Sequence, residues 1–174
     1  MAILPIRTLG DPVLRQPARP VEEFDDALRR LAEDMTQTMH EAPGVGLAAP
    51  QVGRSIRLVV FDIGEGPRAL VNPTLSGHEG EQVGEEGCLS IPGLYFEVPR
   101  AMRVTAEGLD PEGNPVRIEG EELLARVLQH EVDHIDGVLF IDRLDAETRK
   151  LAMAEIRKQE LGLVETSVDP SRAL

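Results

Sequence analysis

Residues 121–137 read EELLARVLQHEVDHIDG and combine a helical hydrophobic pattern with the motif H-E-x-x-H. Apolar residues cover much of the helix circumference, which predicts a buried helix that ends near Gly137. Four residues along a helix turn about 400°, so His130 and His134 share a face and can bind one cation. Glu131 lies about 100° round the helix, where it can hold a water proton instead of becoming a ligand. Because these polar groups would be costly to bury without compensation, the stretch predicts a metal site.

A catalytic metal site normally has three protein ligands and one open position. The longer zincin pattern would place a third histidine at position 140, which is Phe140 in this chain. One candidate for the third ligand is Cys88, in the turn-rich stretch GEEGCLSIPG (84–93). A lone cysteine is more often a small buried hydrophobe, but beside H-E-x-x-H we favour thiolate ligation. Glu155 is the other candidate, although we favour a solvated helix face as the explanation for that residue.

The remaining hydrophobic patterns predict an α+β fold. Apolar residues at spacings of three and four indicate an amphipathic helix within 24–44, and residues 56–63 and 69–75 are expected to be paired strands. Residues 98–120 are typical of a β-hairpin whose turn lies at 110–114, and 145–162 indicate a third helix with Asp145 as N-cap. We therefore predict small, mainly antiparallel sheets packed around the metal-binding helix, with an N-terminal and a C-terminal helix.

Composition limits the possible functions. The chain has 174 residues, 41% of them hydrophobic, and a formal net charge of −13, which disfavours nucleic-acid binding. We expect a single catalytic domain over residues 1–164 and a frayed tail over 165–174. No apolar run suits a signal peptide or a membrane span, and with Cys88 as the only cysteine no intramolecular disulfide can form. A cytoplasmic location follows as the expectation.

The stretch GVGLAAPQVG (44–53) matches the G-x-G-x-x-A form of a dinucleotide-binding fingerprint. That fingerprint needs a strand before it and a helix that starts within it. Here a predicted helix precedes the glycines, and Pro50 and Gly53 prevent a long helix from starting. Two alternatives remain open: a plain connector, or glycines that allow another backbone to approach closely.

Three stretches, GVGLAAPQ (44–51), EGCLS (86–90) and QHEVDHIDG (129–137), together resemble peptide deformylase in order and spacing. The resemblance extends from about residue 3 to 162. It implies an α+β metal-dependent hydrolase that removes the formyl group from the N-terminal formyl-methionine of newly made polypeptides and releases formate. It also implies that a hydroxide held by the metal attacks the formyl carbon.

The resemblance assigns a role to each matching residue. Cys88, His130 and His134 are the implied metal ligands, and Glu131 is the implied general acid and base. The implied donors to the oxyanion are the side-chain amide of Gln51 and the backbone N–H of Leu89.

The substrate is expected to bind as an added strand against Val45, Gly46 and Gly87. Leu123 and Val127 lie seven residues before His130 and His134, so they are proposed with Val45 as the lining of an apolar methionine pocket; plain core packing is the alternative. Two weaker expectations are that Tyr95 flanks the peptide exit and that Asp133 pairs with Arg100 to orient the helix.

The implied cofactor is one divalent metal ion, Fe²⁺ in this family, with Zn²⁺ or Ni²⁺ able to substitute. The expected partners are nascent formyl-methionine polypeptides, with a weak ribosome contact through the C-terminal helix, no membrane, no nucleic acid, and a monomeric chain. Two rivals remain. One is an endopeptidase in which Glu155 completes the ligand set. The other is a structural zinc module, for which His40 and His78 lack ligand spacing.

Overall fold

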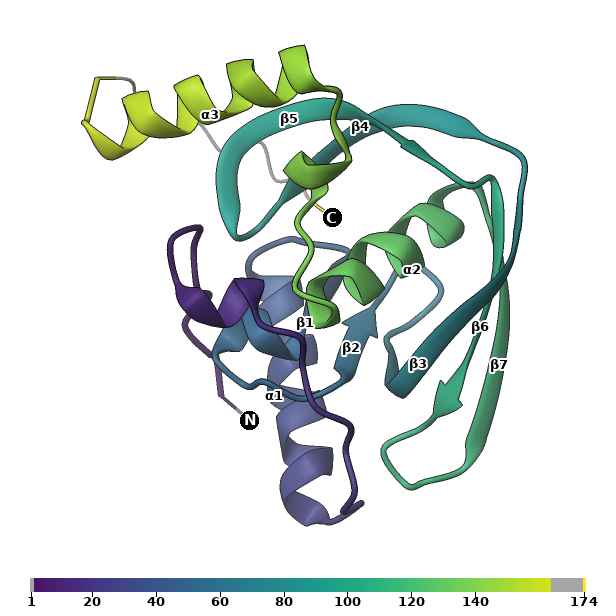
Figure 1. Ribbon diagram of the computed structural model, residues 1–174. Helices are drawn as coiled ribbons and strands as arrows, with labels where there is room; N and C mark the ends of the chain where they lie inside the picture. The colour runs from purple at the N-terminus through teal and green to yellow at the C-terminus, as the bar shows by residue number, and fades with distance from the viewer. Residues whose placement is uncertain (1, 164–173) are drawn as a thin grey trace.

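A computed structural model describes residues 2–163 and residue 174. The central helix α2 (Glu122–Ile135) lies between two antiparallel sheets (Figure 1). Every residue from Ala125 to Ile135 is buried, so this part of the helix is enclosed on all sides. This explains why apolar residues extend round so much of its circumference. The predicted central helix and the α+β class are confirmed.

One sheet has five strands in the order β1-β2-β3-β6-β7, and every neighbouring pair in it is antiparallel. The other sheet is the hairpin β4–β5. The strands are β1 (Gly46–Ala48), β2 (Leu58–Phe61), β3 (Arg68–Glu79), β4 (Gln82–Cys88), β5 (Ile91–Arg100), β6 (Arg103–Leu109) and β7 (Pro115–Glu121).

Two further α-helices and three 3₁₀ turns complete the described part of the chain: α1 (Asp26–Glu41), α3 (Ala146–Glu160), η1 (Pro12–Arg15), η2 (Ala49–Val52) and η3 (Phe140–Arg143). The carboxylates of Asp25 and Asp145 cap α1 and α3 by accepting from backbone N–H groups three residues later. The predicted strand pair, hairpin turn and N-cap at Asp145 all agree with these elements.

One core cluster includes α2, and a second contains Cys88 at the end of β4. One joins Val127, Leu128 and Ile135 to the inner face of the five-stranded sheet. The other packs Cys88 and the apolar residues of β5 against η3 and the buried side of α3. Apolar packing fixes the helix to the five-stranded sheet, whereas polar contacts of Glu86 with His130 and of Arg100 with Asp133 join it to the β4–β5 hairpin. The end of β4 is thus brought beside the His130–His134 face. The predicted tail (165–174) lies outside the described residues except for Leu174.

Candidate metal centre

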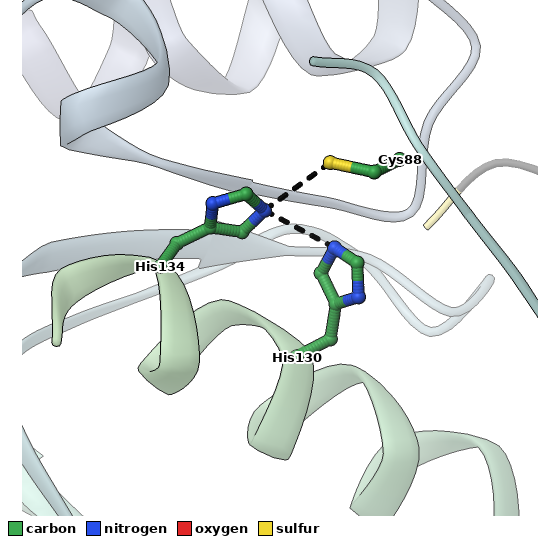
Figure 2. A group of neighbouring side chains, drawn as sticks. All are labelled: Cys88, His130 and His134. Atoms are coloured by element: carbon green, nitrogen blue, oxygen red, sulfur yellow. Dashed lines mark hydrogen bonds between the residues drawn. The ribbon is translucent and has the colours of Figure 1, made fainter. Parts of the chain in front are cut away.

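Helix α2 and the end of strand β4 bring Cys88, His130 and His134 together. Their ligand atoms all lie within 4.8 Å of one another. The Nε2 atom of His134 is 3.3 Å from the Cys88 sulfur and 3.2 Å from the Nε2 of His130, and Figure 2 shows the three side chains converging. Each is at most 3% exposed. One soft and two imidazole ligands around a single point suit a divalent transition-metal ion.

The two histidines differ in their protonation. Burial alone would lower the pKa of His130, but hydrogen bonds with Cys88 and Glu86 outweigh it and raise this pKa to about 10. Burial, together with the charge of His130, lowers the pKa of His134 well below its usual value. A metal ion bound here would have to displace the His130 proton, so metal binding at this site is coupled to pH.

Glu131 is buried beside the ligands without a hydrogen-bond partner. It is 1% exposed, and within residues 2–163 and 174 neither carboxylate oxygen has a partner. Burial raises the pKa of Glu131 to about 7. A Cβ atom at Gly46 would lie only 2.4 Å from Glu131 Oε1, so the glycine makes room for this carboxylate. The group that approaches Gly46 is thus a side chain, whereas the sequence alternative expected another backbone.

The side chain of Gln51 is held in one orientation. Its Oε1 accepts from the Ala48 backbone N–H at 2.9 Å, and its Nε2 lies 3.1 Å from Ser90 Oγ and 3.7 Å from Cys88 Sγ. The amide N–H₂ group therefore points at Cys88 from the 3₁₀ turn η2. Leu89 directly follows Cys88 and is half-buried, with its side chain against Gly44.

Glu86 is a site residue that sequence reasoning missed. Its Oε1 lies 2.8 Å from His130 Nδ1, and the carboxylate also accepts from Arg100 and Arg126. Burial alone would raise its pKa, but the hydrogen bonds from Arg100 and His130 hold the pKa of Glu86 well below the usual range. An ionised Glu86 must accept a hydrogen bond from the Nδ1–H group, which leaves Nε2 of His130 for a metal.

The expected ion pair between Asp133 and Arg100 is present. Arg100 Nη1 lies 2.7 Å from Asp133 Oδ2, and Arg143 also donates to Asp133. Because Arg100 contacts both Glu86 and Asp133, it ties strand β5 to the end of strand β4 and to helix α2.

The residues expected to bind substrate have different surroundings. Val45 is half-buried and Val127 fully buried in one apolar cluster, whereas Leu123 is 46% exposed. The backbone oxygen of Gly87 accepts a hydrogen bond from the backbone N–H of Leu174 at 3.3 Å, so this carbonyl is turned away from the β4–β5 hairpin. Tyr95 is half-buried on β5.

Glu155 does not join the metal group. It lies on α3 and pairs with Lys158, as the solvated-face interpretation expects. Among the residues that the structure describes, the cysteine and the two histidines form the one group suited to a metal. Nor is any helix among them long and apolar enough to cross a bilayer.

The α+β fold and the buried Cys/His/His group define a metal-dependent hydrolase with a glutamate beside its ligands. The model of the family described as Polypeptide deformylase matches residues 3–150. A peptide deformylase from Acidothermus cellulolyticus is 55% identical over 176 residues, which cover 99% of this chain and 98% of the relative. This chain therefore belongs to the polypeptide deformylase family.

Solved structures agree with this assignment. A peptide deformylase from Legionella pneumophila superposes with a TM-score of 0.87 at 47% identity, over 94% of this chain and 99% of the other. The peptide deformylase from Thermus thermophilus gives a TM-score of 0.87 at 49% identity, over 92% of this chain and 96% of the other. The predicted enzyme class is confirmed: members remove the formyl group from the N-terminal formyl-methionine of polypeptides.

Proposed function

We propose that Cys88, His130 and His134 hold one divalent metal ion, Fe²⁺ in the native enzyme, and that residues 1–164 form a single catalytic domain. The observation that carries this proposal is the convergence of one buried thiol and two buried imidazoles within 4.8 Å. The family supports Fe²⁺, and the ligand types also suit Zn²⁺ and Ni²⁺. The chemistry that such an ion supplies is a lower pKa for water and stabilisation of negative charge on oxygen.

Glu131 is the proton carrier in this proposal. It accepts a proton from the attacking water and passes that proton to the amine that leaves when the formyl C–N bond breaks. Its pKa of about 7 suits both halves of this task at neutral pH, because the carboxylate can gain and lose a proton there. Because neither oxygen has a hydrogen-bond partner among the described residues, both are available to the reacting groups.

Gln51 and Leu89 stabilise the oxyanion that forms on the formyl oxygen. The contact of Gln51 Oε1 with the Ala48 N–H aims the Nε2 donor at Cys88, and the Leu89 backbone N–H directly follows that residue. Donors placed in advance are worth more than donors that must reorient during the reaction.

The polypeptide pairs as an added strand with Val45, Gly46 and Gly87. The bond between the Gly87 oxygen and the Leu174 N–H supports this proposal, because it shows that this carbonyl can accept from a peptide N–H. The methionine side chain lies against Val127 and Val45, and the half-exposed Leu123 forms the rim.

We assign the enzyme to the cytoplasm as a monomer that acts on nascent formyl-methionine chains. A weak ribosome contact through α3 is part of this proposal, since Arg149, Lys150, Arg157 and Lys158 lie on that helix among acidic residues. A ribosome-binding assay at physiological salt should show a loss of binding when these four residues are replaced by serine. Equal binding by both proteins would remove the ribosome from the proposal.

Formate release from formyl-methionine peptides, measured on anaerobically purified protein together with its metal content, tests the main proposal. We expect turnover with about one metal ion per chain, and oxygen-sensitive activity if the ion is Fe²⁺ beside a thiolate. The Cys88→Ala variant should lose both metal and turnover, whereas Glu155→Ala should keep both. Turnover that survives in Cys88→Ala would overturn the ligand set.

A further inference from the structure

Arg126 is a buried cation one helical turn before His130. It is only 5% exposed, although its guanidinium group is charged at any pH the protein experiences. Its Nη1 donates to Glu86 Oε2 at 2.5 Å and to the Val98 backbone oxygen at 2.9 Å. A charge is costly to bury unless it is paired, so the position of Arg126 depends on these two bonds.

The bond from Arg126 completes the hydrogen bonding of Glu86. Oε1 of Glu86 receives Arg100 Nη2 and His130 Nδ1, and Oε2 receives Arg100 Nε and Arg126 Nη1. A carboxylate offers about four lone-pair sites, and all four are used here. The carboxylate therefore has no freedom to rotate away from the imidazole without breaking a charge-assisted bond.

The two arginines restrain Glu86 in different ways. Arg100 reaches it from strand β5 and divides its donors between Glu86 and Asp133. Arg126 reaches it from α2, the same helix that carries His130. Because they are four residues apart, Arg126 and His130 lie on one side of the helix and contact the same carboxylate from adjacent turns. Arg126 thus holds the Glu86 carboxylate beside the helix face that carries His130.

We infer that Arg126 is a positioning residue for the metal ligand His130 and that it acts through Glu86. The inference rests on the proposed ligand set. Glu86 fixes which nitrogen of His130 carries the proton and which way the ring faces, and Arg126 fixes Glu86. Gly84 on β4 leaves the space that this arrangement needs, since a Cβ atom there would lie 3.2 Å from Arg126 Nη2.

Metal dissociation measures this role apart from catalysis. Co²⁺-loaded protein is mixed with excess chelator, and loss of the sulfur-to-cobalt absorption band gives the rate. We expect Arg126→Met, which keeps most of the apolar stem, to release Co²⁺ about 10- to 100-fold faster and to shift the d–d bands. Arg103→Met is the matched control, because Arg103 is an exposed residue paired with Glu121 on the sheet surface.

Two further variants separate positioning from plain packing. Arg126→Lys keeps a cation within reach of Glu86, so it should recover most of the Co²⁺ retention. If Arg126→Met fails to fold, Arg126→Gln replaces it as the uncharged variant, and the Co²⁺ retention of Arg126→Lys is compared with that of Arg126→Gln. In a Glu86→Gln background, Arg126→Met should add less than about twofold to the dissociation rate, because the route from Arg126 to His130 is already broken.

The outcomes are distinct. If the unaltered protein shows no sulfur-to-cobalt band, the proposed ligand set fails and the function must be reconsidered. If it binds Co²⁺ and Arg126→Met retains the ion equally well, the positioning role of Arg126 is wrong. The role is also wrong if Arg126→Lys behaves like the uncharged variants, or if the effects of Glu86→Gln and Arg126→Met multiply.

Discussion

Glu86 and Glu131 are two carboxylates buried beside the same helix face, and their surroundings are opposite. Both are at most 1% exposed. Glu86 accepts four hydrogen bonds from two arginines and His130, whereas neither oxygen of Glu131 has a partner among residues 2–163 and 174. The pKa of Glu86 is held well below its usual range, while burial raises that of Glu131 to about 7.

This difference shows that hydrogen-bond donors, and not burial alone, decide whether a buried carboxylate is ionised at neutral pH. Burial raises the pKa of both groups, and only Glu86 has donors enough to reverse the effect. Glu86 is therefore a permanent anion that supports His130. Glu131 is a group that can exchange a proton near neutral pH, which is the property a general acid and base needs.

The largest expected effect comes from replacing each carboxylate by its amide. Glu131→Gln should lower kcat for formate release by about 10²- to 10⁴-fold, because the proton carrier is lost, while metal content is kept and Tm does not fall. Glu86→Gln should instead lose metal and lower Tm, since two buried arginines lose their anion. Turnover, metal analysis and thermal unfolding of both variants check this. If Glu131→Gln releases metal as readily as Glu86→Gln, the two roles are not separate.

The separation of these roles explains what the sequence could predict. His130, Glu131 and His134 lie close together on one helix, so the period of the helix alone places them on or beside one face. Cys88 is 42 positions before His130, so no local spacing joins them: the need for a third ligand made Cys88 a candidate, and the resemblance then assigned it that role. Glu86 lies in the same motif as Cys88, yet no local rule states that its carboxylate reaches His130.

The fold was predictable to a similar extent. Helices α1, α2 and α3 carry regular apolar spacing or caps, and the hairpin β6–β7 has a turn rich in Pro, Gly and Asn. Strand β4 (Gln82–Cys88) has three acidic or amide side chains and two glycines, so it lacks the alternation that signals a strand. Its pairing with β5, and hence the position of Glu86, depends on contacts between distant parts of the chain. Arg126 was equally hidden, because a lone arginine in a helix is usually solvated.

Two glycines of the stretch 44–53 test how closely Glu131 is confined. A Cβ atom at Gly46 would lie 2.4 Å from Glu131 Oε1, and one at Gly44 would lie 2.7 Å from Leu89 Cδ1, the end of a flexible side chain. Gly46→Ala should therefore displace the carboxylate and lower kcat by about 10²-fold. Gly44→Ala is the matched comparison and should cost less than about tenfold, because Leu89 can rotate away. Equal kcat values in a formate-release assay would mean that Glu131 tolerates displacement.

The smallest effect is on stability, and its sign distinguishes the two carboxylates. Because its pKa is about 7 in the folded chain and 4.5 in the unfolded chain, Glu131 binds its proton more tightly when folded. The metal-free protein should lose stability as pH rises from 4.5 to 7, by up to about 3 kcal/mol from this group. Glu86 has the opposite shift, so its contribution is present above pH 4.5 and is lost as pH falls below that value.

Denaturant unfolding of chelator-treated protein between about pH 2 and 7 can measure both contributions as differences. His130 and His134 also contribute to the pH dependence, but both remain in Glu131→Gln. Subtracting the free energy of unfolding of the unaltered protein from that of the variant at each pH therefore isolates the contribution of Glu131 to a first approximation. The advantage of Glu131→Gln should grow as pH rises toward 7. The deficit of Glu86→Gln should instead shrink as pH falls below 4.5. A flat difference curve for Glu131→Gln would mean that its carboxyl group is hydrated in solution, and the contrast between the two carboxylates would then lose its physical basis.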